Sequence, residues 1–114
     1  MRWRALVTAG LAAALGAACG PPETLGERAC TAEGAKLTYE SFGRGFFDRW
    51  CVRCHGAGEG YSSRSFTSVE AIRAARERIF VNAVGDDPPM PPGPDDPPVA
   101  EREQLADWLA CGAR

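Results

Sequence analysis

Histidine, methionine and lysine are scarce in this chain of 114 residues. It contains one histidine, one lysine and two methionines, the first of which is the initiator. A formal net charge of -2 gives no electrostatic basis for binding nucleic acid. No apolar run reaches the roughly 20 residues that span a bilayer, and the sequence has neither an alternating strand pattern nor an internal repeat. These absences predict one small globular domain with very few soft metal ligands.

The first 18 residues have the pattern of an export signal. Two arginines precede an uncharged stretch from Ala5 to Ala18 that is mostly Ala, Leu, Val and Gly. A basic start before a short apolar run that ends in small residues is typical of a secretory signal peptide. The segment Leu15–Cys19 resembles the lipobox of bacterial lipoproteins, with the leucine one place further from the cysteine than is usual. The resemblance implies a lipid on Cys19 that anchors the chain to a membrane. Ordinary cleavage after Ala14 would instead leave a free thiol.

Export places the mature chain in an oxidising compartment, where disulfides form. Residues 19–36 are rich in Gly, Pro, Glu and Thr and predict a tether and a lead-in loop, and residues 37–114 predict the folded domain. A domain of this size seldom holds together on its apolar core alone. Cys30 and Cys111 can pair and join the lead-in loop to the end of the last helix. The alternative is two free, buried thiols.

The folded domain is expected to be all-α. Behind Thr38, a suitable N-cap, large apolar residues recur at spacings near three and four, which indicates an amphipathic helix. These residues are Phe42, Phe46, Phe47, Trp50, Cys51 and Cys54. Ser68 can cap a second helix that Gly85 stops, and a last helix follows Pro98. Residues 86–98 contain seven of the nine prolines and predict a stiff, extended loop, because proline lacks an N–H and fixes φ.

The sequence Cys51-Val-Arg-Cys54-His55 has the pattern of covalent c-type haem attachment. At a helix end, positions i, i+3 and i+4 share a face. Two thiols on that face could add across the vinyl groups of a porphyrin, while the adjoining imidazole reaches the iron as proximal ligand. Attachment takes place outside the cytoplasm in bacteria, and the signal peptide meets that condition.

Three other kinds of site would use the same cysteines. A zinc site needs four ligands, and the other candidates, Cys30 and Cys111, each stand alone in the sequence. A thioredoxin-like motif should follow a strand in a βαβ unit, whereas Gly43–Trp50 predicts a helix. A structural disulfide between the two cysteines of the motif would leave the histidine without a role.

Met90 is the candidate for the second axial ligand. The chain has no second histidine, and the initiator leaves with the signal peptide, so Met90 is the one thioether of the mature chain. It stands 35 residues beyond His55, with two prolines on each side. A methionine usually fills gaps in a core. This one lies in a stiff, polar segment that can hold a weak donor on a metal, and His/Met pairs coordinate c-type haem.

Together these features resemble a monohaem class I c-type cytochrome, over residues 37–112. The matching segments are Gly43-x-x-x-Phe47-x-x-x-Cys51-x-x-Cys54-His55, Leu105-x-x-Trp108 and Met90-Pro-Pro, which are similar to that family's N-terminal helix with its haem site, its C-terminal helix and its distal loop. The resemblance implies three or four helices wrapped around one covalent haem c. It also implies that the N- and C-terminal helices cross where Gly43 lets Trp108 approach. Gly45 has no assigned role.

The function that the resemblance implies is electron transfer at the cell envelope, not catalysis. His55 and Met90 would fill both axial positions of the iron, so that the protein carries one electron between a donor and an acceptor protein. It would act on the periplasmic side of a membrane, held by the lipid on Cys19. The alternatives are a haem sensor or weak peroxidase in which Met90 dissociates, and a module of a larger oxidoreductase.

The charges differ from those of the lysine-rich mitochondrial type, because Lys36 is the single lysine and the loop around Met90 is acidic. That loop would suit a basic partner, or its aspartates are a solvated face. They are Asp86, Asp87, Asp95 and Asp96. Three arginines of the middle helix would likewise either hold haem propionates or face solvent. They are Arg73, Arg76 and Arg78.

Overall fold

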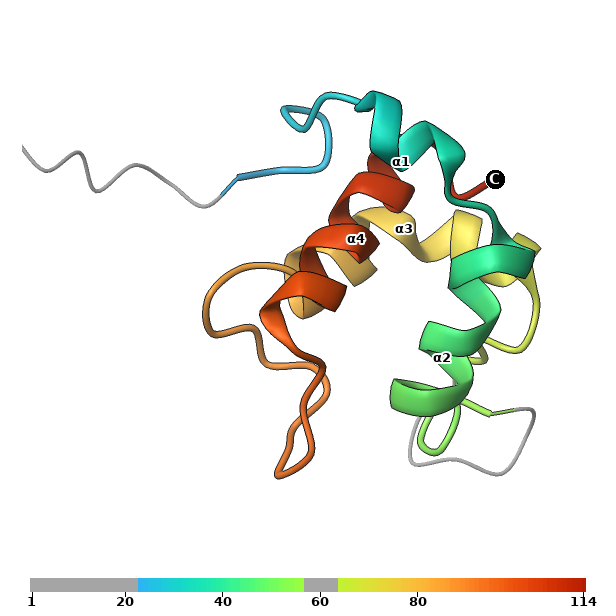
Figure 1. Cartoon of the computed structure of the whole chain (residues 1–114). Helices are drawn as coiled ribbons and strands as arrows, with labels where there is room; N and C mark the ends of the chain where they lie inside the picture. The colour runs from blue at the N-terminus through green and yellow to red at the C-terminus, as the bar shows by residue number, and fades with distance from the viewer. Residues whose placement is uncertain (1–22, 57–63) are drawn as a thin grey trace, which may run out of the picture.

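Helices and the loops between them make up the parts of the chain that the structure, a computed structural model, describes: residues 23–56 and 64–114 (Figure 1). In chain order the elements are α1 (Ala32–Lys36), the π-helix η1 (Tyr39–Gly43), α2 (Arg44–Trp50), α3 (Val69–Ala83) and α4 (Val99–Ala110). No strand occurs in the two described ranges, which confirms the all-α class. The signal peptide and Cys19 lie outside them, as do residues 57–63, which belong to a Gly- and Ser-rich stretch, from Gly56 to Ser65, that the sequence predicts to be a loop.

The predicted first helix forms as two consecutive segments, η1 and α2. Thr38 caps it as expected, because its Oγ1 accepts from the N–H of Ser41 and its own N–H donates to the Ser41 hydroxyl, each at 3.0 Å. The helix ends at Trp50 and not at Cys54. Beyond it the chain makes a separate turn, in which the N–H groups of Cys54 and His55 donate to the carbonyl of Cys51 at 3.1 and 2.9 Å.

The later helices start and stop where the sequence predicts. Ser68 caps α3 by accepting from the N–H of Ala71 at 3.2 Å, and Gly85, at φ +102°, follows the end of α3 in a conformation that favours glycine. Helix α4 begins directly after Pro98. In the described residues, no helix is both long and apolar enough to cross a membrane.

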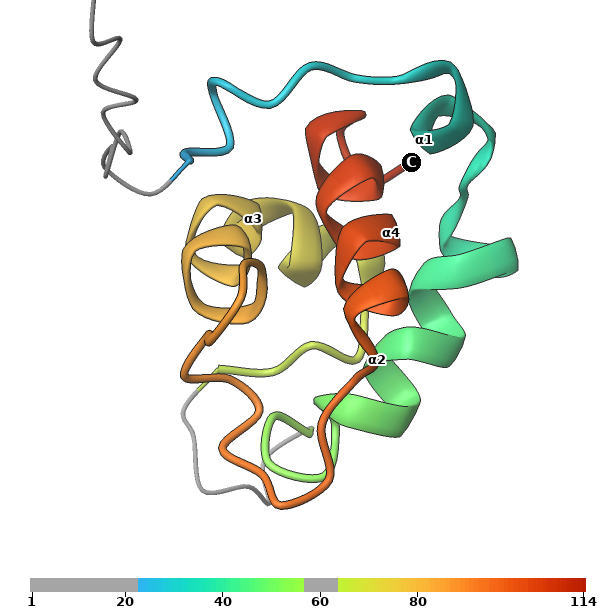
Figure 2. The ribbon, with the colours of Figure 1, turned by 60° about the vertical axis from the view of Figure 1, so that its left-hand side comes forward.

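Trp108 of α4 is the centre of the core and joins the first and last helices. Its side chain is fully buried, and its ring lies 6.2 Å from that of Phe47. A Cβ atom on Gly43 would lie 2.5 Å from Cη2 of Trp108, so the two helices lie close together at this glycine, as the family resemblance implied. At the other end the indole N–H of Trp50 donates to Glu101 at 2.9 Å. The two helices therefore run in opposite directions, side by side in Figure 2.

We expect Gly43→Ala to lower the free energy of unfolding by about 1–3 kcal/mol, because the added methyl must displace the buried Trp108 ring. Gly45 provides a matched control two residues away, since a Cβ there meets no atom within 4 Å. Gly45→Ala should be neutral or stabilise by up to about 1 kcal/mol, the difference in helix propensity. Denaturant unfolding of both variants measures the contrast, and equal effects would contradict the packing described.

The lead-in segment before Leu37 is more ordered than the sequence suggested. Helix α1 lies within the region predicted as a tether and loop, and Leu25 is buried in the core. The guanidinium of Arg28 donates to Asp107 and to Glu103 of α4, both at 2.8 Å. A helix of five residues is too short to show a periodic pattern in the sequence. Its packing against α4 is tertiary and was therefore not foreseen.

Candidate functional site

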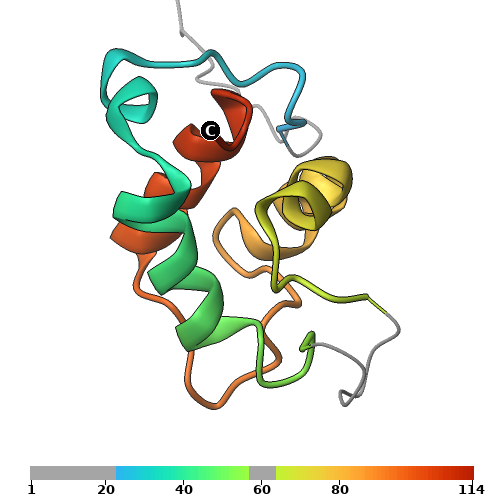
Figure 3. The same cartoon turned by 90° about the vertical axis from the view of Figure 1, so that its right-hand side faces the viewer.

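An apolar cavity of about 310 Å³ lies between the end of α2, the C-terminal half of α3 and the proline-rich loop. Cys51, Cys54 and His55 line it from the turn after α2, and Met90 lines it from the loop. Figure 3 shows the three segments that carry these walls. The apolar lining consists of Phe46, Phe47, Trp50, Phe66, Ile79, Ala83, Pro91 and Pro92. The structure thus brings together at one cavity the four residues that the sequence singled out for a cofactor.

His55 is fixed by contacts with two residues of the segment that begins at Arg64. Its Nδ1 lies 3.1 Å from the carbonyl oxygen of Arg64, and the N–H of Phe66 donates to the His55 carbonyl at 2.8 Å. The Phe66 ring stacks on the imidazole, with centroids 4.7 Å apart. A carbonyl oxygen only accepts, so Nδ1 is the donor in this contact, and Nε2 is the ring nitrogen left to bind a metal.

Met90 is held by its backbone while its side chain stays outside the core. Its N–H donates to the carbonyl of Asn82 at 2.9 Å, and its own carbonyl accepts from Arg102 at 2.8 Å. The residue is 43% exposed and does not belong to the core cluster. It is therefore not the gap-filler that a buried methionine usually is.

The cysteines of the turn differ from those of a redox motif. Both are free in the structure. Burial raises the pKa of the Cys51 thiol to about 12, and the positive charge of Arg102 offsets part of that rise. At neutral pH this thiol is protonated, whereas thioredoxin-like motifs use a thiol whose pKa is lowered. The described residues also lack the strand that such a motif should follow. A separate metal site is not seen either, because no three Cys, His, Asp or Glu side chains of the described residues lie close enough together to hold a metal ion.

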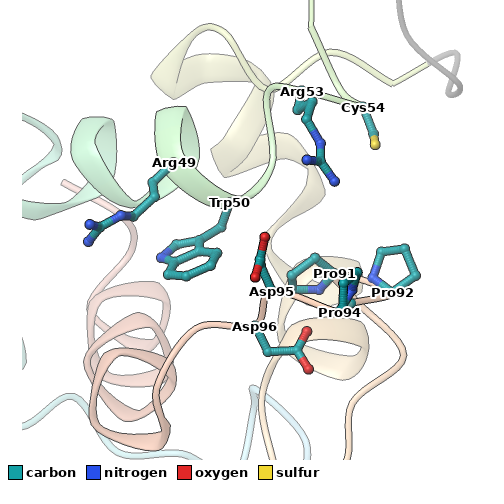
Figure 4. A pocket seen from close by; sticks show the side chains of 10 residues that line it. Arg49, Trp50, Arg53, Cys54, Pro91, Pro92, Pro94, Asp95 and Asp96 are labelled. Atoms are coloured by element: carbon teal, nitrogen blue, oxygen red, sulfur yellow. The ribbon is translucent and has the colours of Figure 1, made fainter.

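A larger and more polar cavity, of about 570 Å³, adjoins the apolar one through Trp50, Cys54, Pro91 and Pro92. Figure 4 shows Trp50 and Arg53 on the α2 side, facing the loop that carries Asp95 and Asp96. This cavity lies beside the apolar one, between the cysteine turn and the proline-rich loop.

The charged residues weighed in the sequence fall into different environments. Of the three arginines of α3, only Arg78 lines the apolar cavity, while Arg73 donates to the carbonyl of Ala113 at 2.8 Å. Asp86, Asp87 and Asp95 are exposed. Asp96 has an inward partner, because its carboxylate lies 3.7 Å from the guanidinium of Arg102.

Arg102 is the residue of the site that sequence reasoning missed. It is 6% exposed, the one buried charged residue in the described ranges. Its position was visible in the pattern, because residues 102, 105 and 109 fall on one face of a helix and the other two are leucines. A cation on an apolar face indicates buried hydrogen-bond acceptors. Phe66 is a second residue of the site that the sequence reasoning missed. Its large aromatic side chain in a Ser-rich stretch was the available signal.

The other two cysteines of the described residues lie apart from the cavity. Cys30 and Cys111 form a disulfide, with Cα atoms 4.7 Å apart, that ties the segment before α1 to the end of α4. Cys19, the predicted lipid site, lies outside the described residues. None of the protein-family models, curated proteins or solved structures compared with this chain matches it.

Proposed function

We propose that this protein is an electron carrier of the cell envelope with one haem c, attached through Cys51 and Cys54 and ligated by His55 and Met90. One observation carries the proposal: a single apolar cavity is lined by the two free thiols, the oriented imidazole and the thioether. Ligand sites of this kind are concave and mainly apolar, with a few polar groups placed at specific points.

The donor set fits a haem better than a bare metal ion. The site offers one imidazole and one thioether, the pair found in cytochromes of the c type, and no cluster of harder ligands lies in the described residues. Aromatic and aliphatic side chains supply walls that a planar porphyrin would contact. Arg78, at the cavity, is the arginine of α3 placed to pair with a propionate.

Each residue would have a definite task. The Cys51 and Cys54 thiols would each add to a vinyl group, with a new sulfur–carbon bond and the thiol proton passing to the neighbouring vinyl carbon. His55 would donate through Nε2 because Arg64 and Phe66 fix its ring. Met90 would donate its sulfur from a loop whose backbone is already bonded on both sides. When bound, the haem supplies an iron that accepts one electron from a donor protein and passes it to an acceptor.

Carbon monoxide binding to the reduced protein distinguishes a carrier from a sensor or peroxidase. With Met90 on the iron, the wild type should bind the gas slowly at neutral pH, and Met90→Ala should bind it at least about tenfold faster, because that variant has lost the competing ligand. Absorption stopped-flow measures both rates. Rapid binding by the wild type contradicts the simple carrier, and equal rates in the two proteins contradict ligation by Met90.

Two parts of the proposal rest on the sequence alone. Export follows from the signal peptide over residues 1–18, and attachment to a membrane follows from a lipid on Cys19. The partners would be a redox donor and a redox acceptor on the periplasmic side. Metabolic labelling with a fatty acid tests the anchor, since Cys19→Ala should lose the label and appear in the soluble periplasmic fraction.

A further inference from the structure

The carbonyl of Met90 is held to the helices by one buried side chain. Arg102 projects from the first turns of α4, and its Nη1 donates to the carbonyls of both Ala83 and Met90, each at 2.8 Å. Ala83 is the last residue of α3, and Met90 lies in the loop that follows. One guanidinium therefore connects α4, the end of α3 and Met90, a residue that lines the cavity.

The charge of Arg102 is only loosely paired. Its carboxylate partner, Asp96, lies 3.7 Å away and its side chain is 53% exposed, whereas the Arg102 side chain is 7% exposed. A buried cation is costly unless hydrogen bonds satisfy it, and here the two carbonyl groups do so. The short contacts are to the backbone, so the role of Arg102 lies in positioning the chain at residues 83 and 90.

We propose that Arg102 is the positioning residue for Met90: it fixes the backbone of the loop so that the thioether stays at the cavity, and without it the sulfur leaves. The inference rests on the proposed function, because it assigns Met90 as a ligand. It goes beyond that function by naming what keeps a partly exposed methionine of an irregular loop in place. It also distinguishes Met90, which would touch the cofactor, from Arg102, which would act through Met90.

The alternative is that the prolines alone hold the loop. Proline restricts φ of its own residue and the conformation of the residue before it, so a stiff loop could present Met90 without help from α4. A stiff loop still needs contacts that attach it to the rest of the protein, however. Two backbone hydrogen bonds of Met90, one to Asn82 and one from Arg102, attach the loop to α3 and α4. The proline-only and the Arg102 mechanisms therefore predict different results when Arg102 is changed.

Amide hydrogen exchange at Met90 provides a direct readout that needs no electron-transfer assay. Residues 88, 89, 91 and 92 are prolines, so Met90 carries the one backbone N–H between Asp87 and Gly93. In the haem-loaded wild type this amide should be protected by its bond to Asn82. In Arg102→Met we expect its exchange to be at least about tenfold faster, the scale of losing a hydrogen bond to a charged donor. Binding of carbon monoxide should accelerate by a similar factor.

Two further variants keep the test interpretable. Arg28→Met removes another partly buried arginine bonded to α4, none of whose partners lines the cavity, so both readouts should match the wild type. Arg102→Lys keeps the charge, but one ammonium lacks the planar fork of a guanidinium. It should therefore give a smaller acceleration, of at least about threefold, and it decides the matter if Arg102→Met does not fold.

The outcomes separate the two claims. A wild type without covalent haem contradicts the proposed function, whatever the exchange rates are. A haem-loaded wild type whose Met90 amide and gas-binding rate are the same in the folded Arg102 variants contradicts only the role of Arg102. Accelerated exchange and gas binding in the Arg102 variants, with both unchanged in Arg28→Met, support it.

Discussion

Replacing both Cys51 and Cys54 by serine is expected to abolish covalent attachment completely, so that no haem remains on the denatured polypeptide. Hydroxyl groups do not form the thioether bonds, and the chain has no other free thiol in its described residues. His55 and Met90 alone would leave the cofactor held by axial ligation and apolar contact, both of which are lost on unfolding. Haem staining of the protein after denaturing electrophoresis measures the effect.

The second cysteine pair provides the matched control for that experiment. The double variant Cys30→Ser and Cys111→Ser also replaces two cysteines, but these two form a disulfide outside the cavity. It should retain its haem stain. A stained Cys51/Cys54 double variant would contradict attachment at the motif, and an unstained Cys30/Cys111 variant would show that staining reports folding instead.

Loss of the disulfide is expected to have the largest effect on stability. It closes a loop across 81 positions of sequence, for which the chain-entropy model gives about 4.5 kcal/mol, and removing such bonds from small secreted domains costs about 2–5 kcal/mol. For a domain of this size that cost lowers Tm by roughly 10 °C or more. Part of this loss of stability would come from the segment before α1, because the disulfide would no longer hold Arg28 near its hydrogen-bond partners on α4.

Thermal unfolding with and without a thiol reductant tests this expectation. The reductant should lower the Tm of the wild type to that of the Cys30→Ser and Cys111→Ser variant and leave the variant itself unchanged, since haem thioethers are not reduced. A wild type whose Tm is insensitive to the reductant, with the variant equally stable, would contradict a stabilising disulfide.

Local rules were sufficient to predict the helix boundaries that depend on capping residues. Thr38 and Ser68 begin helices because their side chains satisfy free N–H groups, and the last helix follows a run of prolines that cannot be helical. The close approach at Gly43 was implied by the family resemblance, in which a glycine of the first helix leaves room for the C-terminal helix. For the capping residues and the prolines, the signal lies in the residue type at one or two positions.

What the sequence did not reveal depends on contacts between distant segments. Helix α1 is too short to have a pattern of its own, and α2 ends before the cysteines, where the chain turns into a separate bend. The contacts of Arg64 and Phe66 with His55 join residues on either side of positions 57–63, which local sequence rules cannot relate. The contact of Arg102 with the Met90 carbonyl joins a helix to a loop that periodicity cannot place.

The four residues of the candidate site were singled out from the sequence, but the groups that contact and orient them were not. Residue types and spacing identified the thiols, the imidazole and the thioether, since few other soft ligands exist in the chain. The groups that orient them are a backbone carbonyl, a stacked phenyl ring and a buried guanidinium, and none of these has a characteristic spacing. Their roles are visible only once the cavity is seen.

The intact mass of the exported wild-type protein, measured after denaturation, tests the central claim most directly. Addition of two thiols to two vinyl groups loses no atoms, so the account predicts the mass of the mature polypeptide, with its Cys30–Cys111 disulfide and the lipid on Cys19, plus the full mass of one haem. The expression host must attach haem to a known exported cytochrome in parallel. A polypeptide of bare mass, or one lighter by two further hydrogens from a bond between Cys51 and Cys54, would contradict it.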